Sequence, residues 1–407
     1  MGLARFTAYA VLAGSILGAR SAGAQGSGTA SDTPADKDTA TVADSATAAD
    51  SGAGSASSAT NYVQTLLLGL TISGYAEASY SYATENSGST TVGRLFDHTH
   101  DEIALNALKL VLDRPYAADK FDAGFHADVL FGQNASLIQA AGLKLGDQGD
   151  IPQLFVTLNI PTANGNGFQF KAGKMVTLMG VEVIEDVVNP NWSEGYQFIF
   201  VENFTALGLS AEYKFNPHLD AQLRVTNGWD VVTDNNGRKS FMGRVGVYPD
   251  DKTSIGLVGY LGPEQAVDTT ADRYGVNLVL NRKLGRASVW LQGDYGKEEA
   301  NAALPDPTRD AEWWAVGGWL TYEFTPMIGV AFRGDYLDDR DGARTSGVLG
   351  FPANTGMKVG SGTATLNIRR WPNMLVRPEI RYDRSDLPAF DGKQDQFTFA
   401  LSAAYLY

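Results

Sequence analysis

The stretch QFTFALSAAYLY, residues 396–407, decides the fold class of this chain. Its odd-numbered positions carry Phe, Phe, Leu, Ala, Tyr and Tyr, whereas its even-numbered positions from 396 to 404 carry Gln, Thr, Ala, Ser and Ala. Successive side chains of a β-strand point to opposite faces, so this strand would have one face suited to lipid and one that tolerates water. The pattern predicts a strand of a transmembrane β-barrel.

The same division recurs toward the N-terminus in about sixteen segments, which clusters of Gly, Pro, Asn and Asp separate. In residues 328–336 and 376–383 the charged side chains all fall on the face opposite the apolar one. A soluble β-sandwich, the alternative fold, would need unusually many and long strands for one domain. We therefore predict an all-β, antiparallel, up-and-down transmembrane barrel. The strands are expected to begin near Leu70, Glu102, Lys120, Ile151, Gly167, Thr205, Leu219, Lys239, Thr253, Asp272, Arg286, Ala311, Met327, Met357, Met374 and Asp395.

The links between these strands alternate between short and long. Short links hold pairs such as Arg114-Pro115, Asn216-Pro217 and Leu284-Gly285. The long links are residues 84–101, 132–150, 178–204, 230–238, 263–271, 298–310, 339–355 and 385–394. Outer-membrane barrels have short periplasmic turns opposite long extracellular loops, so the alternation predicts that location. Aromatic residues near strand ends, such as Tyr80, Trp229 and Trp371, are expected to form two girdles at the membrane interfaces.

The first sixty residues differ in composition from the rest. Residues 1–24 contain Arg5, an apolar run from Phe6 to Ala19 and the cleavage pattern Ala22-Gly23-Ala24, which together predict a signal peptide for export. The alternative is a membrane anchor, but the run is shorter than the ~20 residues that a spanning helix needs. Residues 25–60 are nearly all Ala, Ser, Thr, Gly and Asp, which predicts a disordered spacer, or alternatively a tether to a periplasmic partner. Residues 61–407 form the predicted barrel domain.

Composition and motifs argue against several functional classes. The chain has no cysteine, which excludes disulfides, cysteine-ligated metals and thiol nucleophiles. Its net charge of −14 argues against nucleic acid as a partner. It lacks G-x-S-x-G, H-E-x-x-H and the phosphate-binding G-x-x-x-x-G-K, and the only closely spaced histidines are His98 and His100 on a predicted loop. We expect no cofactor, no metal and no catalytic residue.

A segment folded into the lumen is the best candidate for a functional site. At this strand number a barrel is too wide for its own side chains to fill, so the lumen holds water unless something enters it. The longest link, between the fifth and sixth strands, carries five carboxylates: Glu182, Glu185, Asp186, Glu194 and Glu202. We predict that it folds inward as a constriction loop; an exposed acidic loop is the alternative. Strand phase directs six arginines into the lumen as the facing wall: Arg224, Arg244, Arg333, Arg369, Arg377 and Arg381.

Two stretches of the chain resemble a known family. Residues 173–200 read GKMVTLMGVEVIEDVVNPNWSEGYQFIF, and residues 113–132 read DRPYAADKFDAGFHADVLFG. They resemble the OmpL-like β-barrel porin-2 family of Gram-negative outer membranes, and the resemblance extends from about Leu70 to the end. The matching positions are Gly173, Lys174, Gly180, Glu182, Glu185, Asn189, Asn191 and Ser193, with Asp113, Arg114, Pro115, Asp128 and Gly132 in the second stretch. The chain departs from the family at Val181 and Trp192, where tyrosine is expected. The resemblance implies a diffusion porin, and likeness to large porins implies a homotrimer.

These observations predict an outer-membrane porin with a water-filled channel for passive diffusion of small hydrophilic solutes and ions. Its expected partners are the outer-membrane lipid and the assembly machinery that reads a C-terminal aromatic strand. The acidic balance favours cations, since facing rings of charge select solutes by field and width. A substrate-selective transporter is the first alternative, because Trp290, Trp313 and Trp319 on lumen faces would suit sugar stacking. A barrel enzyme such as a phospholipase is the second, and would need a histidine near a serine or aspartate on the outer strands.

Overall fold

The structure is a computed structural model that describes residues 63–65, 69–162, 167–266, 270–301, 304 and 306–407. The expected signal peptide, residues 1–24, and spacer, residues 25–60, lie outside the described residues. The described part of the chain is almost entirely β-sheet. None of its helices is long and apolar enough to cross a membrane.

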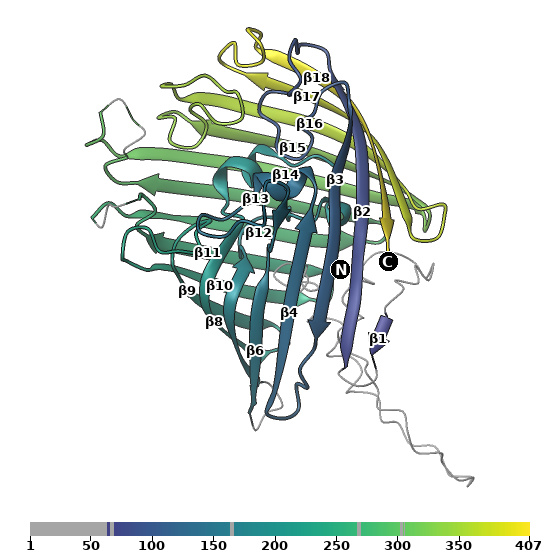
Figure 1. Ribbon diagram of the computed structural model, residues 1–407, viewed down its shortest axis with the longest axis vertical. Helices are drawn as coiled ribbons and strands as arrows, with labels where there is room; N and C mark the ends of the chain where they lie inside the picture. Colours follow the sequence, from purple (N-terminus) through teal and green to yellow (C-terminus); the bar gives the residue numbers. More distant parts are fainter. Residues whose placement is uncertain (1–62, 66–68, 163–166, 267–269, 302–303, 305) are drawn as a thin grey trace.

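Sixteen long antiparallel strands form a closed barrel (Figure 1). The last strand pairs with the first long one, for example Leu401 with Tyr80, so the sheet has no free edge between them. The strands are β2 (Leu70–Ala83), β3 (Ile103–Arg114), β4 (Asp122–Phe131), β6 (Leu154–Pro161), β7 (Gly167–Val176), β8 (Thr205–Asn216), β9 (Leu219–Thr226), β10 (Ser240–Asp250), β11 (Thr253–Gly262), β12 (Arg273–Leu284), β13 (Ala287–Glu298), β14 (Ala311–Thr325), β15 (Ile328–Asp339), β16 (Met357–Ile368), β17 (Met374–Ser385) and β18 (Asp395–Leu406). Each observed start lies within three residues of the predicted one, which confirms the predicted barrel.

Alternation of side chains separates an apolar outer face from a polar inner face. On β15, Phe332 is 48% exposed, whereas the next residue, Arg333, is 3% exposed. The same contrast holds on β17 between Ile380, which is exposed, and Arg381, which is buried. A closed barrel with exposed apolar side chains and buried charges has the inverse of a soluble protein's surface, as membrane insertion requires.

The seam between the two ends of the barrel is closed by the last residue. The backbone of Tyr407 exchanges hydrogen bonds with Gly74 at 2.9 and 3.0 Å, and its ring hydroxyl donates to the carbonyl of Lys109 at 2.8 Å. A Cβ on Gly74 would lie 2.3 Å from the Tyr407 ring and 2.0 Å from that same carbonyl oxygen. Glycine is therefore required at position 74 for the ring to lie across β2 and reach β3.

Short and long links alternate around the barrel as predicted, and the long links contain the remaining elements. Two-residue turns join β8 to β9 and β14 to β15, whereas residues 84–102 join β2 to β3. The shorter elements are β1 (Val63–Thr65), α2 (Gln133–Leu137), β5 (Gly149–Asp150), the 3-10 helix η3 (Asp186–Val188) and the π-helix η4 (Gln197–Val201). All long loops therefore meet at one end of the barrel, which we call the long-loop end.

Candidate functional site

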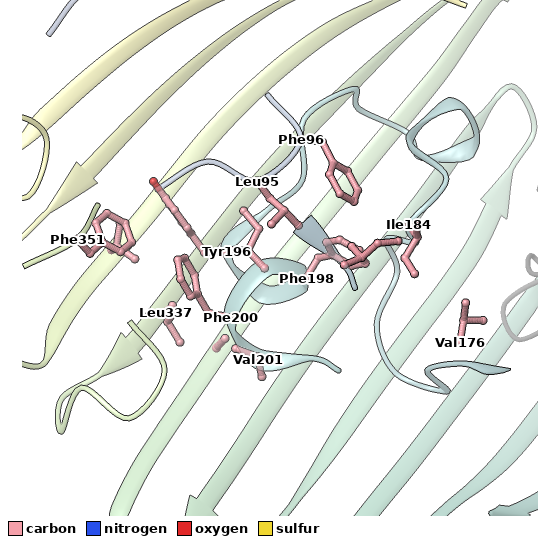
Figure 2. Packing of buried hydrophobic residues seen from close by; sticks show 14 of the residues in the cluster. Leu95, Phe96, Val176, Ile184, Tyr196, Phe198, Phe200, Val201, Leu337 and Phe351 are labelled. Carbon is pink, nitrogen blue, oxygen red and sulfur yellow. The ribbon is translucent and has the colours of Figure 1, made fainter. Parts of the chain in front are cut away.

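The site is built from residues 177–204, the link between β7 and β8, which we call the inner loop. Its two ends are tied together by the backbone hydrogen bond from Thr177 to Phe204 at 3.1 Å and by the hydroxyl of Thr177, which donates to Asn203 at 2.8 Å. Between these ends the loop leaves the wall and contacts the inner face of every strand from β12 to β17. It therefore lies inside the barrel, as Figure 2 shows for the turn around Phe198.

Two loop carboxylates form ion pairs with cations on the wall. Glu182 accepts hydrogen bonds from Arg333 of β15 at 2.7 Å and from the indole N–H of Trp319 of β14 at 3.2 Å. Glu185 contacts the ammonium of Lys109 on β3, which also lies 3.3 Å from Asp128. These carboxylates and their cations are all at most 3% exposed. Removal of either member of such a pair is strongly destabilising, because the other member would remain as an uncompensated buried charge.

Two wall arginines of β17 bind backbone carbonyls of the inner loop. Arg377 donates to the carbonyl of Asp186 at 2.6 Å and pairs with Glu77 of β2 at 2.9 Å. Arg381 donates to the carbonyl of Glu194 at 2.6 Å and pairs with the neighbouring Asp383. The guanidinium fork lets each side chain join the wall to the loop.

Wall carboxylates also hold the loop, but here the loop donates: its backbone N–H groups bind to carboxylates of the wall. Glu379 accepts from the N–H groups of Trp192 at 2.8 Å and Ser193 at 3.2 Å. Asp335 accepts from the N–H of Tyr196 at 2.6 Å. The stretch of the loop between η3 and η4 has no regular structure, so its backbone donors need other partners, and these contacts supply them inside the barrel. Charges of both signs on the wall therefore hold the loop in place.

The remaining loop carboxylates are buried with few or no partners. Glu202 accepts one hydrogen bond from Gln292 at 2.8 Å, and neither carboxylate oxygen of Glu194 has a partner among the described residues. Burial raises the pKa of Glu194 well above its usual value, and the carboxylates of Asp186, Asp97 and Glu182 raise it further. Burial and then the Glu77 carboxylate likewise raise the pKa of Asp186, although Arg377 opposes them. The five loop carboxylates are 0–2% exposed, so they face the wall rather than open water.

An aromatic cluster packs the inner loop against other loops at the long-loop end (Figure 2). Phe351, from the link between β15 and β16, lies 5.5 Å from the ring of Phe200 and 6.2 Å from that of Tyr196. Phe198 lies 6.4 Å from Phe96, which belongs to the link between β2 and β3. Apolar burial and ion pairing therefore fix the same loop from two sides.

The structure does not bring all six predicted wall arginines to the loop carboxylates. Only Arg333 contacts one through its side chain, whereas Arg377 and Arg381 reach loop carbonyls. The other three lie apart from them. Arg224 donates to the carbonyl of Val176, and Arg244 pairs with Asp220 at 2.9 Å and lies 3.0 Å from the hydroxyl of Tyr248. Arg369 lies one residue beyond β16, is 44% exposed and has its nearest carboxylate, Glu323, at 3.7 Å.

Sequence reasoning missed Lys109 and Trp229. A register shift in β3 places Asn106 and Ala107 both in the interior. Alternation counted from Ile103 and Leu105, which face outward, would therefore place Lys109 on the outer face, whereas it faces the lumen. Trp229, which was expected in an interfacial girdle, instead packs against Tyr260 inside the barrel, with ring centroids 4.9 Å apart. For Lys109 the sequence does carry a signal: Leu108, Leu110 and Leu112 alternate around it, which indicates that the leucines face lipid and Lys109 faces the lumen.

The described residues include no group of three or more histidine, aspartate or glutamate side chains that could hold a metal ion. His98 lies 2.7 Å from the carbonyl of Leu95, and the ring of His100 accepts from the N–H of Ala83 at 3.1 Å. Both histidines therefore contribute to the structure of the link between β2 and β3.

Residues 69–407 match the family model described as "Putative beta-barrel porin-2, OmpL-like". The chain belongs to this porin family. The match covers the whole barrel and confirms the resemblance found in residues 113–132 and 173–200. The family and fold place the protein in the bacterial outer membrane as a channel-forming porin.

Solved outer-membrane proteins share this porin's fold at low sequence identity. The outer membrane channel DcaP of Acinetobacter baumannii is 15% identical, with a TM-score of 0.53 over 83% of this chain and 97% of that one. An anion-selective porin from Comamonas acidovorans is 10% identical, with a TM-score of 0.55 over 83% and 99%. The trimer form of OmpT from Vibrio cholerae is 9% identical, with a TM-score of 0.51 over 83% and 99%. No curated protein sequence matches this porin.

Proposed function

We propose that this porin is a water-filled channel for passive diffusion of small hydrophilic solutes and ions, and that the inner loop is its constriction. The observation that carries the proposal is the attachment of this loop to the wall. Glu182 of the loop forms an ion pair with Arg333, and the backbone N–H of Trp192 donates to the carboxylate of Glu379. A loop fixed across the lumen narrows it without sealing it, and ring-like arrangements of charge then act on passing solutes.

The proposed path for solutes follows the inner faces of β7, β8 and β12 to β14 near their short turns, because the inward-facing residues of β9 to β11 are buried as well. Inward-facing residues of β15 to β18 are almost all buried under the inner loop and its neighbours. On the opposite side, Lys171 of β7, Glu212 of β8 and Ser288 of β13 face inward and remain partly exposed. Three cations, Lys171, Lys214 and Lys283, are among these partly exposed inner residues. Because the loop carboxylates are buried, this wall contributes more to ion preference than the net charge of the chain does.

Export, assembly and oligomeric state are part of the proposal. Residues 1–24 would direct export, and the terminal aromatic strand would be read by the outer-membrane assembly machinery. The apolar outer face, including Phe332 and Ile380, would contact lipid or a second copy. A homotrimer is supported by the trimer form of OmpT, which has the same fold.

A planar-bilayer recording of the purified protein tests the channel function. Ohmic current steps whose size scales with the conductivity of the salt solution are expected for a water-filled lumen. Heat-denatured protein is the control, because it keeps the composition but loses the barrel. A folded, heat-modifiable preparation that gives no steps would contradict the proposed channel and favour the barrel-enzyme alternative.

A further inference from the structure

Two arginines and two tryptophans meet at the long-loop end of the lumen. Arg273 begins β12 and Trp313 lies near the start of β14, whereas Trp229 and Arg344 come from the links after β9 and β15. The guanidinium carbon of Arg273 lies 5.0 Å from the Trp229 ring centroid and 5.9 Å from that of Trp313. The corresponding distances for Arg344 are 5.6 and 5.5 Å. Each guanidinium therefore contacts both indole rings, which fixes its plane.

A row of two glycines makes room for this cluster on the inner wall. The residues Tyr260, Gly275, Gly296 and Trp313 are consecutive cross-strand neighbours on β11, β12, β13 and β14. A Cβ on Gly275 would lie 2.4 Å from the hydroxyl oxygen of Tyr260, and a Cβ on Gly296 would lie 2.3 Å from the Trp313 ring. The two rings thus lie over the glycines and lean toward each other. Directly paired positions are about 5 Å apart, so the two rings lie close to each other.

Donors without acceptors gather around these two rings. Among the described residues, the Arg344 side chain donates one hydrogen bond, from Nε to the carbonyl of Phe200 at 2.6 Å, and its two terminal nitrogens have no partner. Arg273 pairs with Glu298 at 2.8 Å through one terminal nitrogen, while its buried Nε has no partner. Within the part of the chain that the structure describes, the buried Tyr260 hydroxyl and the indole N–H of Trp313 also lack partners. A buried donor without an acceptor is costly, and here several are close together.

The nearby carboxylates are already engaged: Glu264 accepts from the N–H of Trp229 at 2.6 Å and the hydroxyl of Ser240 at 2.6 Å, and Asp230 accepts from the backbone N–H groups of Phe204 and Thr205 at 2.8 Å. Glu298 is shared between Arg273 and the side-chain amide of Asn301. Asp339 accepts from the backbone N–H groups of Ala343, Arg344 and Thr345 at 2.8–3.1 Å. Burial lowers the pKa of Arg344 to about 10, and repulsion from Arg273 contributes to this shift. Two adjacent guanidiniums with unused donors are suited to an acceptor that carries negative charge.

We propose that Arg273, Arg344, Trp229, Trp313 and Tyr260 form a binding site for a small carboxylate-bearing solute, which we call the mouth site. A carboxylate accepts two parallel hydrogen bonds from a guanidinium fork, and the second guanidinium provides for a second carboxylate. Glu298 and Glu264 lie beside Arg273, and Asp230 and Asp339 lie beside Arg344, so the preference for a carboxylate comes from the unused donors of the two guanidiniums rather than from a surplus of positive charge. The inference rests on the proposed channel function, because it names a solute class that the same lumen takes up.

The test uses succinate as the probe and its uncharged diamide, succinamide, as the matched control solute. Purified wild-type protein in detergent is titrated while its tryptophan fluorescence is followed, since Trp229 and Trp313 border the site. In a separate bilayer experiment, succinate is added from the long-loop side and the block of the chloride current is measured. The variants are R273Q/R344Q, the conservative R344K, and R340Q as a control. Arg340 lies in the same link as Arg344, but its side chain is 58% exposed and outside the cluster.

Succinate is expected to change the fluorescence and reduce the chloride current, whereas succinamide should do neither. R273Q/R344Q should weaken both effects by about tenfold or more, as loss of charge-assisted hydrogen bonds requires. R344K, which keeps the charge but loses the planar fork, should lie between it and the wild type, and R340Q should match the wild type. If the double variant does not fold, the succinate affinity of R344K is compared with that of R340Q, and a weaker affinity of R344K supports the mouth site.

The two proposals fail in different ways. A wild-type channel that conducts chloride but gives no succinate block and no fluorescence change overturns the mouth site and leaves the channel intact. Equal responses to succinate and succinamide, or equal affinity in wild type and R344K, also overturn it. Absence of current with saturable succinate fluorescence supports the mouth site and contradicts the channel.

Discussion

The side chains of Glu182 and Arg333 lie 2.7 Å apart and are nearly completely buried between the inner loop and the wall. Glu194, on the same loop, is equally buried, but no other described residue gives its carboxylate oxygens a cation or a hydrogen-bond donor. Desolvation costs both carboxylates, and only Glu182 is compensated by a direct partner. The two residues should therefore respond to neutralisation in opposite ways.

Replacing Glu194 with glutamine should stabilise the barrel at pH 8. The raised pKa means that the folded state holds a proton on this carboxyl more firmly than the unfolded state does. Stability is then greatest below the unfolded pKa of about 4.3 and is lost as pH rises toward the folded value. E194Q should raise the temperature of heat modification on electrophoresis by a few degrees at pH 8. The gain should shrink at pH 4.

The matched control is E182Q on the same loop, which leaves Arg333 buried without its partner. It should lower the free energy of unfolding by roughly 3–5 kcal/mol. If E194Q and E182Q shift the heat-modification temperature in the same direction at pH 8, burial of Glu194 without a partner is not the cause of its behaviour.

At the scale of strands, the periodic pattern was sufficient because one face of every strand meets lipid. The starts of β2, β7 and β18 were predicted without error, whereas that of β6 was placed three residues early. The two-residue β5 pairs with β4 just before β6 does. The interruption between β5 and β6 was therefore taken from the sequence as the start of β6. The register shift in β3 has the same character: local irregularities change the phase without changing composition.

The contacts of the inner loop lay beyond sequence reasoning for a different reason. Its acidic residues and the wall arginines were identified, but the pairing of Glu185 with Lys109 joins residues 76 positions apart. Strand phase says that a side chain faces the lumen and not how far it lies from the loop. Arg244 and Arg369, which strand phase assigned to the lumen wall, accordingly lie apart from the loop carboxylates.

The seam between β18 and β2 gives a prediction about folding. Deleting Tyr407 removes two backbone hydrogen bonds to Gly74 and the ring that crosses to Lys109. We expect less folded, heat-modifiable barrel in the membrane. Y407F keeps the ring and the backbone bonds, so it should be close to wild type, whereas G74A should resemble the deletion because its Cβ would meet the ring. A normal yield from both the deletion and G74A would show that the seam does not limit assembly.

The alternation of short and long links predicts the sides of the membrane. The chain has no cysteine, so a single introduced thiol reports without background. R309C lies in the long link before β14 and should react with an impermeant maleimide on intact cells. K252C lies in the short turn between β10 and β11 and should react only after the outer membrane is opened. Reaction of K252C alone on intact cells would reverse the orientation.

For the whole molecule, net charge is a poor guide to what passes through the lumen. The chain carries −14, yet the loop carboxylates are buried and Arg333, Lys109, Arg377 and Arg381 are buried with the loop. The partly exposed inner residues include several cations, and the mouth site adds two more. An ion in the pore responds to the charges within about one Debye length, roughly 8 Å at physiological salt, rather than to the total.

The Glu182–Arg333 pair can show whether the inner loop borders the ion path. E182Q leaves an uncompensated guanidinium and should shift the reversal potential in a salt gradient toward anions. R333Q leaves an uncompensated carboxylate and should shift it toward cations. E182Q/R333Q removes both charges, should fold better than either single variant, and should return the potential close to the wild-type value. Each variant is first checked for heat-modifiable folding. Opposite shifts that cancel in the double variant place the pair beside the path, because weakly screened charges act at close range. Three folded variants with wild-type reversal potential would place the path more than a Debye length from the pair and end the interpretation of the loop as a constriction.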